Sequence, residues 1–417
     1  MLSSAHTVAS AASAGCLRRH RRQLTRMAAR CGPGEALLGS SADVVDSTVL
    51  ISGGGMAGIG AAAGLVTAGV DVVICEQGRG LGGRVCTRHV RDKALLFDHG
   101  CQYFAPKPGS PFADLLVELE RQGVVERWAS GRLGTVECHD QRLAASTFTP
   151  WSADKQAWVG VPSMSTVGKH LLVDAARQPG AGKLTVALGT RVAPGTLRRD
   201  GDAWLAETHA KSTPEQRRST RHRFVMALGS ASSTFNIVSP VAPQLAAPAG
   251  MVQANCCWAL MVAFAQPVTA GVAHLAFDGA LVHGSDAIAW VANNSTKPGR
   301  RQPGSATECW VVHASPEWSN ARRDAAADTV VGELLAAFAE CMGQQSMPAV
   351  VHLEAFRWNA AFPLSVADSG GAGCFVDAQA GLGLGGDFCV GPRAGDAWHS
   401  GRMAAQAVLR AMAATQA

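Results

Sequence analysis

The chain has very little tyrosine and no regular spacing of its cysteines. Tyr103 is the only tyrosine in 417 residues. Twelve cysteines are present, but none are arranged as C-x-x-C, the spacing typical of structural zinc sites and redox motifs. Most cysteines lie in apolar stretches, where cysteine behaves as a small hydrophobic residue. We therefore expect no structural metal and a reducing compartment.

Acidic residues are missing from the first 34 positions. This segment is rich in Ala and Ser and carries six arginines. Such a composition favours an organellar transit peptide, and a disordered basic tail is the alternative. Without this segment, 31 basic side chains (37 minus 6) stand against 32 acidic ones, so we expect no nucleic-acid partner.

Charged residues are absent from residues 224–277, which contain no Asp, Glu, Lys or Arg. Pro240, Pro243, Pro248 and Pro267 interrupt any run of about 20 residues, so a membrane-spanning helix is not expected. We predict a buried sheet with apolar loops, with peripheral membrane contact as an alternative. The charged residues just before it, 211–222, are predicted to form a loop.

The strongest pattern lies in residues 48–84. It predicts a strand at 48–52, a glycine-rich turn, a helix of small residues and a second strand at 70–75. Gly53, Gly55 and Gly58 have the G-x-G-x-x-G spacing, in which the glycines allow a tight turn, close approach of a pyrophosphate, and helix–strand packing. The helix N-terminus offers free N–H groups to phosphates. Glu76, at the end of the second strand, is placed to bind an adenosine ribose.

Strand–glycine–helix patterns occur near both ends of the chain, the second of them at 381–412, and the middle is rich in strands. This arrangement predicts an α/β fold: a Rossmann-like dinucleotide-binding domain with an inserted mixed α+β substrate domain. We assign residues 44–105, 162–235 and 350–417 to the first domain. Residues 106–161 and 236–349 are assigned to the second.

Gly82, Gly83 and Arg84 follow shortly after Glu76, and this extension resembles the two-dinucleotide-binding flavoproteins, which include amine oxidases, phytoene desaturases and renalases. Narrower blocks are FDHGCQYF at 97–104, CWALMVAF at 257–264, IAWVANNSTKPGR at 288–300 and ECWVVHASPEWS at 308–319. These blocks are similar to the renalase-like oxidoreductases of plants and cyanobacteria. The resemblance implies non-covalent FAD and favours the plastid stroma, with the mitochondrion as the alternative location.

The resemblance also implies which residues contact the cofactor. The predicted set is Gly53, Gly55, Met56, Ala57, Gly58, Glu76, Gln77, Gly83, Arg84, Gln102, Val192, Gly386, Asp387, Asp396 and Ala397. Within it, Arg84 corresponds to the arginine near the pyrophosphate, and Asp387 to the acid near the ribityl chain. Val192 matches the adenine contact. The helix from Asp396 is expected to point its N-terminus at the flavin.

The resemblance implies oxidation of a small dihydropyridine-type donor, such as an isomer of NAD(P)H, with O₂ as the acceptor. The flavin would supply the redox chemistry, so no catalytic residue is assigned. Substrate contacts are expected from Trp290, Asn294, Lys297, Arg300 and Trp358. Lys297 and Arg300 suit an anionic ligand, although a solvated turn is the alternative interpretation.

Three other functions fit the same sequence. A flavin amine oxidase is the first, although the single tyrosine excludes a pair of tyrosines around the amine, and tryptophan would have to substitute. A desaturase acting on a carotenoid or tetrapyrrole is the second, suggested by the uncharged residues 224–277. A flavin-binding protein without turnover is the third. It is suggested by the order of Gly395 and Asp396, which departs from the Glu-Gly order of the family.

Overall fold

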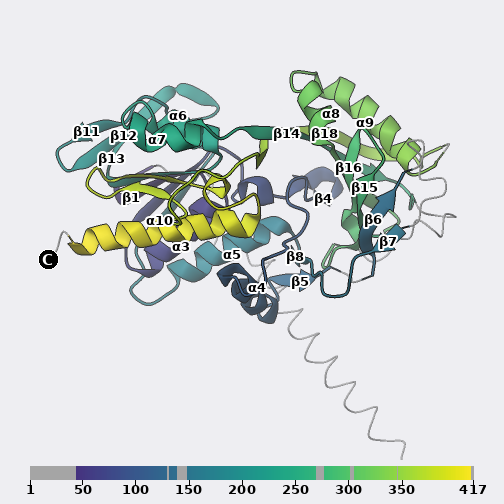
Figure 1. Ribbon diagram of the computed structural model, residues 1–417, viewed down its shortest axis with the longest axis horizontal. Coiled ribbons are helices and arrows are strands. Elements are labelled where there is room, and N and C mark those ends of the chain that lie inside the picture. Colours follow the sequence, from purple (N-terminus) through teal and green to yellow (C-terminus); the bar gives the residue numbers. More distant parts are fainter. Residues whose placement is uncertain are drawn as a thin grey trace, which may run out of the picture.

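The computed structural model describes residues 44–128, 131–138, 148–268, 277–300, 305–344 and 346–414. The predicted transit peptide, residues 1–34, lies outside these ranges. Two sheets organise the described part of the chain, and each forms the centre of one half of the molecule (Figure 1). No helix in the described ranges is long and apolar enough to cross a membrane.

A parallel sheet forms the first half. Its order is β20 (Leu382–Gly385), β13 (Thr213–Leu228), β1 (Ser47–Ser52), β2 (Val72–Glu76) and β9 (Leu184–Leu188). Antiparallel strands extend it: β19 (Phe375–Asp377) beside β20, and β12 (Ala203–Ala210), β10 (Thr190–Val192) and β11 (Arg198–Asp200) beyond the start of β13. Val49, Leu50 and Ile51 of β1 are fully buried, as expected for a central strand covered on both faces.

Helices cover both faces of this sheet. On one face lie α3 (Met56–Thr67), α5 (Met164–Ala176) and α10 (Ala394–Ala414), and on the other α6 (Ala231–Val238) and α7 (Pro243–Gly250) (Figure 1). The side chains of β1 alternate between the two cores, with Val49 in one and Leu50 in the other. Small residues bring α3 and α10 together: a Cβ on Gly401 would lie 1.8 Å from the Ala57 carbonyl oxygen.

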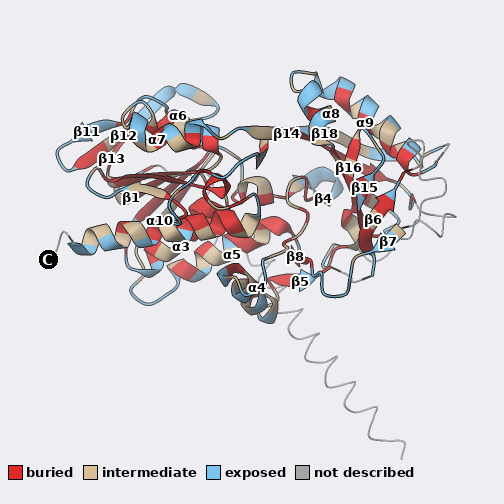
Figure 2. Cartoon of the chain, viewed as in Figure 1, coloured by how far each residue is buried: buried red, intermediate tan, exposed pale blue. Residues whose placement is uncertain are grey.

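A seven-stranded sheet forms the second half. Its order is β18 (Val350–Pro363), β14 (Ala254–Phe264), β17 (Glu308–Ala314), β16 (Ile288–Asn293), β15 (Gly279–His283), β6 (Leu133–Glu137) and β7 (Phe148–Pro150). Neighbouring strands are antiparallel except β15 and β6. The helices α8 (Pro316–Ala321) and α9 (Ala327–Cys341) cover it, and Phe264, Trp310 and Phe338 pack in its core. Figure 2 shows the buried residues concentrated in the two sheets and on the helix faces against them.

Shorter elements accompany the two sheets. They are η1 (Gly83–Val85), β3 (Arg88–Val90), η2 (Arg91–Lys93), β4 (Leu95–Phe97), α4 (Pro111–Arg121), β5 (Val125–Arg127), β8 (Trp158–Gly160), η4 (Asn294–Thr296) and η5 (Asp387–Cys389). The loop between β4 and Phe104 is held to η4 of the second half, because the Asn294 side chain accepts a hydrogen bond from the backbone N–H of Asp98.

Two expectations for local structure were wrong. The predicted loop 211–222 is instead largely the first part of β13, a single strand of 16 residues. Its side chains are mostly exposed, because this part of the strand pairs with β12 beyond the helical layers. A strand without a buried face has no apolar alternation, so the sequence pattern could not show it. Residues 224–277 are also not sheet throughout, since α6 and α7 lie within them.

The predicted domain boundaries differ from the structure at three places. β18 pairs along most of its length with β14, so residues 350–363 belong to the second sheet and not to the nucleotide domain. Helices α6 and α7 pack in the core of the parallel sheet, on the nucleotide side of the boundary predicted at residue 236. Phe112 and Leu116 of α4 share a core with Val49, which places α4 with the parallel sheet as well.

Candidate functional site

A cavity of about 2370 Å³ runs from the parallel sheet to the second sheet. At one end it is lined by residues that follow the carboxyl ends of β1, β2, β9, β13 and β20. Ligands of open α/β sheets bind at this edge. At its other end, residues of the second sheet form the wall, including Trp290, His313, Phe356 and Trp358.

The turn between β1 and α3 needs two glycines for packing and leaves the third open. A Cβ on Gly53, whose φ is +114°, would lie 2.1 Å from the Leu228 carbonyl oxygen. A Cβ on Gly58 would lie 1.9 Å from the Gly53 carbonyl oxygen. A Cβ on Gly55 would meet no described atom within 4 Å, although Gly55 lines the cavity. The backbone at Gly55 is therefore open to a ligand.

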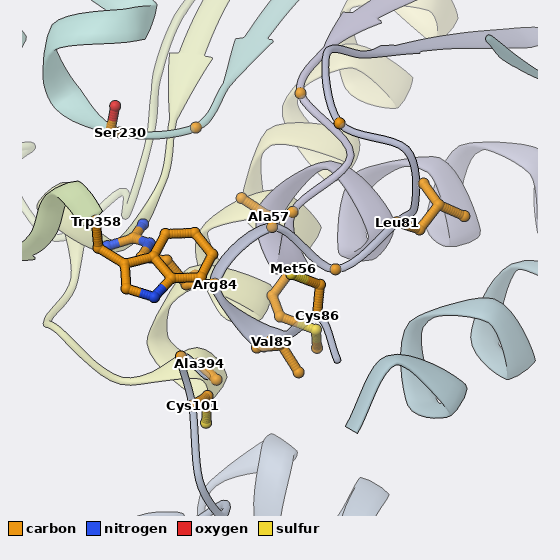
Figure 3. Close-up of a pocket in the computed structure, with 18 of the residues that line it drawn as sticks. Met56, Ala57, Leu81, Arg84, Val85, Cys86, Cys101, Ser230, Trp358 and Ala394 are labelled. Carbon is orange, nitrogen blue, oxygen red and sulfur yellow. The ribbon is translucent and has the colours of Figure 1, made fainter. Parts of the chain in front are cut away.

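The N-terminus of α3 faces the same cavity. Gly55 is the N-cap and no described side chain caps the helix. Met56 and Ala57, whose backbone N–H groups belong to the first turn, line the cavity (Figure 3). An uncapped first turn has free N–H groups and the positive end of the helix dipole, which together bind anions such as phosphate.

Glu76 is held rigidly at the end of β2. Its carboxylate oxygens accept hydrogen bonds from the backbone N–H groups of Gly54, at 2.7 Å, and Gly78, at 2.5 Å. Burial raises the pKa of Glu76, and these two hydrogen bonds act in the opposite direction. Glu76 and Gln77 both line the cavity, so a ribose hydroxyl at this point would meet a fixed carboxylate.

Arg84 joins three distant segments at the middle of the cavity. Its Nη1 donates to Asp387 Oδ2 at 2.5 Å and to the carbonyl oxygen of Ala361, in β18, at 3.0 Å. Asp387 is buried, whereas the side chain of Arg84 is partly exposed and lines the cavity together with Trp358 (Figure 3). The preceding glycines, with positive φ at Gly82 and Gly83, allow the chain to pass close to Gly55.

The start of α10 also borders the cavity. The helix begins at Ala394, two residues before the predicted start at Asp396. Asp396 lies in the first turn, where its Oδ2 accepts a hydrogen bond from the backbone N–H of Arg393 at 3.3 Å and its Oδ1 lies 3.5 Å from Lys107 Nζ. The carboxylate therefore accepts from the residue just before the helix, and residues 392–397 at this N-terminus line the cavity.

All predicted cofactor residues line this cavity except Gly58, which packs behind the turn. Val192 lies in β10 at the edge of the first sheet and is buried. Gln102 is tied back to the protein: its side-chain amide donates to the Asp98 carbonyl oxygen, and its Oε1 accepts from Asn294 Nδ2 at 3.3 Å. The chain thus brings together segments that lie up to about 340 residues apart in sequence, from Gly53 to Ala397.

The predicted substrate residues divide into two groups. Trp290 and Trp358 line the cavity, but Asn294, Lys297 and Arg300 do not. Lys297 Nζ lies 2.9 Å from Asp98 Oδ2, and Arg300 Nη2 lies 2.6 Å from the same oxygen. The Lys297 and Asp98 side chains are fully buried and Arg300 is 2% exposed, so these cations bind a carboxylate of the chain and not a substrate.

The charges in this buried cluster control one another. Burial alone would raise the pKa of Asp98, but the positive charges of Lys297 and Arg300 hold it below its usual value. Burial lowers the pKa of Lys297 to about 8, and Asp98 opposes that shift. Because Asp98 begins the loop that carries His99 to Gln102, the cluster fixes the position of one cavity wall.

Two histidines of the cavity were not predicted from the sequence. His99 is 4% exposed and lines the cavity. His313 Nε2 donates to the His99 carbonyl oxygen at 3.1 Å, as does Trp358 Nε1 at 2.9 Å. Burial lowers the pKa of both histidines to about 4, so both are neutral near pH 7. The available signal was their place in FDHGCQYF and ECWVVHASPEWS.

Comparisons with known proteins agree with this architecture. Residues 51–119 match a family model described as an NAD(P)-binding Rossmann-like domain. A candidate protoporphyrinogen oxidase from Exiguobacterium sp. 255-15 superimposes with a TM-score of 0.63 at 12% identity, over 89% of this chain and 99% of that one. A triple mutant of putrescine oxidase superimposes with a TM-score of 0.61 at 12% identity, over 88% of this chain and 99% of that one. An oxidoreductase from Methanosarcina mazei superimposes with a TM-score of 0.58 at 12% identity, over 86% of this chain and 99% of that one.

At these identities the likeness shows the fold. It confirms the predicted fold class, an α/β structure with a Rossmann-like domain.

Proposed function

We propose that the protein is an FAD-dependent oxidoreductase that binds FAD non-covalently along the carboxyl ends of the parallel strands. The observation that carries this proposal is the continuous cavity of about 2370 Å³, which joins an open dinucleotide cradle to an aromatic pocket. The fold alone would not suffice, because one fold supports many functions.

The residues present fit the cofactor. Gly55 leaves room for a pyrophosphate beside the free N–H groups of α3, and Glu76 offers a fixed acceptor for ribose hydroxyls. Arg84 places a positive charge at the middle of the cavity, and the N-terminus of α10 directs a positive dipole end toward it. When bound, the flavin supplies two-electron redox chemistry, and the protein orients the donor and excludes water.

We further propose a dihydropyridine-type donor, such as an isomer of NAD(P)H, with O₂ as the acceptor. The second end of the cavity supports this donor because aromatic side chains line it: Tyr103, Trp290, Phe356 and Trp358 stand beside neutral His99. Aromatic walls of this kind stack on planar rings. Renalase-like oxidoreductases, which the sequence blocks resemble, are the family with this activity.

An amine oxidase is the second candidate, because one protein of similar fold is a putrescine oxidase. Such enzymes hold the amine between two aromatic rings. Tyr103 and Trp290 are one aromatic pair of the cavity, and their centroids lie 5.5 Å apart with an interplanar angle of 44°. The two rings contact each other and leave no gap for an amine, which favours the dihydropyridine donor.

An anaerobic titration separates the candidates. The flavin-loaded protein is mixed with an equilibrated NAD(P)H solution that contains its minor isomers, and in parallel with putrescine and other amines. We expect rapid loss of the visible flavin band with the nicotinamide mixture, and its return with peroxide formation when air is admitted. Reduction by amines alone would favour the second candidate, and a flavin that stays oxidised with every donor would contradict the proposal.

A further inference from the structure

Two cysteines from distant parts of the chain bring their sulfur atoms together in the core of the second half. Cys138 follows β6 and Cys341 is the last residue of α9, and they lie 203 residues apart in sequence. Their Sγ atoms are 3.7 Å apart, the one sulfur–sulfur hydrogen-bond contact among the described cysteines. A disulfide needs a separation of about 2.05 Å, so rotation of the two side chains has only a short distance to close.

The backbone holds both cysteines in place. The backbone N–H of Cys138 donates to the carbonyl oxygen of His283, the last residue of β15, at 2.8 Å. Met342, which follows Cys341, is 1% exposed, and its backbone N–H donates to the Phe338 carbonyl oxygen at 2.9 Å. The two sulfur atoms therefore stay within reach of each other whenever the second half of the molecule is folded.

The two thiols differ in access and in acidity. Cys138 is 7% exposed, whereas Cys341 is fully buried. The hydrogen bond that they share lowers the pKa of Cys138, and the same bond together with burial raises the pKa of Cys341. The thiolate is the form of cysteine that reacts with oxidants. Cys138 is therefore the thiol that a small oxidant would meet first, with Cys341 beside it as the resolving thiol.

We propose that Cys138 and Cys341 are a redox modification site, at which a peroxide forms a reversible disulfide that ties the C-terminal end of α9 to the end of β6. In the first step the Cys138 thiolate attacks one peroxide oxygen, the O–O bond breaks, and Cys138 becomes a sulfenic acid. In the second step the sulfur of Cys341 attacks the sulfur of Cys138, and the S–O bond breaks. With hydrogen peroxide, the two thiols lose their two hydrogen atoms and two molecules of water leave. The proposal does not depend on the function assigned to the cavity, although O₂-dependent turnover of a flavin would be one source of the peroxide.

Peptide mapping of the purified wild-type protein tests the proposal directly. The reduced protein is treated with hydrogen peroxide, the excess is removed with catalase, and the protein is then denatured with iodoacetamide present and digested without reductant. We expect one cross-linked peptide pair that contains Cys138 and Cys341, and its loss on treatment with dithiothreitol. Cys309, which should stay a free thiol and become alkylated, is the matched control. It is also 7% exposed and lies in the same sheet, but has no sulfur–sulfur hydrogen bond to another described cysteine.

Thermal melting measures the effect of the cross-link on the folded protein. Peroxide treatment of the wild type should raise the melting temperature by about 5 °C, because a bond between residues 203 positions apart restricts the unfolded chain. Cys341→Ala should show no such rise, and Cys309→Ala should show the rise of the wild type. If peroxide leaves Cys138 and Cys341 open to alkylation, or converts them to sulfinic acids without a cross-link, the proposal is wrong. A cross-link that leaves the melting temperature unchanged would overturn the claim that it ties α9 to β6.

Discussion

At the residue scale, Asp98 lies at the centre of a charged cluster that is buried away from solvent. One of its oxygens faces both Lys297 and Arg300, and none of the three side chains is more than 2% exposed. Removing one partner from a buried ion pair leaves the other charge without compensation, which costs more than the pair itself contributes. The cluster is therefore most sensitive to the loss of Asp98, the one carboxylate that both cations share.

Asp98→Asn should lower the free energy of unfolding by about 3 kcal/mol, because the buried cations Lys297 and Arg300 would both lose their carboxylate. The double variant Asp98→Asn with Lys297→Met should be more stable than Asp98→Asn alone, since it removes one of the two uncompensated charges. Chemical denaturation of the three proteins measures both differences. If Asp98→Asn unfolds at the wild-type denaturant concentration, the two cations are solvated in solution and our account of the cluster is wrong.

This cluster also shows what a sequence can and cannot reveal about a site. The KPGR segment was predicted to meet an anionic ligand, and its cations do meet an anion, but that anion is Asp98 of the same chain. The sequence shows that residues 297 and 300 are charged, and it contains no information on which carboxylate lies opposite them. His99 was missed for the related reason that a histidine in an apolar block looks like an ordinary core residue.

At the element scale, the β1–α3–β2 unit was predicted closely because its determinants are local. The predicted strand at 48–52 corresponds to β1 at Ser47–Ser52, and the glycines of the turn follow directly from the backbone they must allow. The first part of β13 was not predicted because its side chains are mostly exposed, and β18 was not predicted because its pairing partner lies elsewhere in the chain. β18 pairs with β14, about 90 residues earlier, and several of its side chains remain exposed.

Substitution by alanine should affect stability at one glycine of the β1–α3 turn and leave it nearly unchanged at another. Gly53→Ala should prevent stable folding, because its Cβ would clash with the Leu228 carbonyl oxygen at 2.1 Å and its φ of +114° is unfavourable for alanine. Gly55 has a φ of −77°, and a Cβ added there would meet no described atom within 4 Å. The Gly55→Ala apoprotein should therefore keep the wild-type free energy of unfolding within about 1 kcal/mol.

Gly55→Ala should nevertheless weaken FAD binding by at least about tenfold, because the new methyl group enters the space assigned to the pyrophosphate. Thermal melting of the apoproteins and fluorescence titration with FAD give the two quantities separately. Unchanged FAD affinity in a stable Gly55→Ala protein would place the phosphates somewhere other than the turn between β1 and α3.

At the scale of the whole molecule, the site exists only where the two halves meet. Arg84, Ala361 and Asp387 are joined by hydrogen bonds across about 300 residues of sequence, and His99, His313 and Trp358 are joined in the same way. The sequence motifs predicted the nucleotide end of the cavity, because the backbone conformation of the turn requires a glycine at each of these positions. The substrate end depends on how the second sheet sits against the first, which no local pattern encodes.

Acid should destabilise the molecule well before its carboxylates titrate. Burial lowers the pKa values of His99, His222 and His313 to about 4, against about 6.5 in the unfolded chain. Between these two values the unfolded state binds more protons, so stability falls as the pH falls from about 6.5 to about 4. Each histidine contributes at most about 1.4 kcal/mol per pH unit in this range.

Urea denaturation at pH 7, 6, 5 and 4.5 measures this dependence. His222→Gln should reduce the slope of the free energy of unfolding against pH by the contribution of one titrating group. His222 is 1% exposed and is held neutral between Ser47 and Thr220. A free energy of unfolding that stays constant from pH 7 to pH 4.5 would mean that these histidines are solvated or protonated in the native state.

The most direct test of the account is whether the protein binds FAD. The purified protein is examined for the visible flavin absorption band, and the flavin released on denaturation is identified by chromatography; apoprotein is then titrated with FAD beside the Gly55→Ala variant. We predict one non-covalent FAD for each chain, with affinity reduced by the variant. A stable protein that neither carries nor takes up flavin would contradict the proposed function and the role assigned to the cavity.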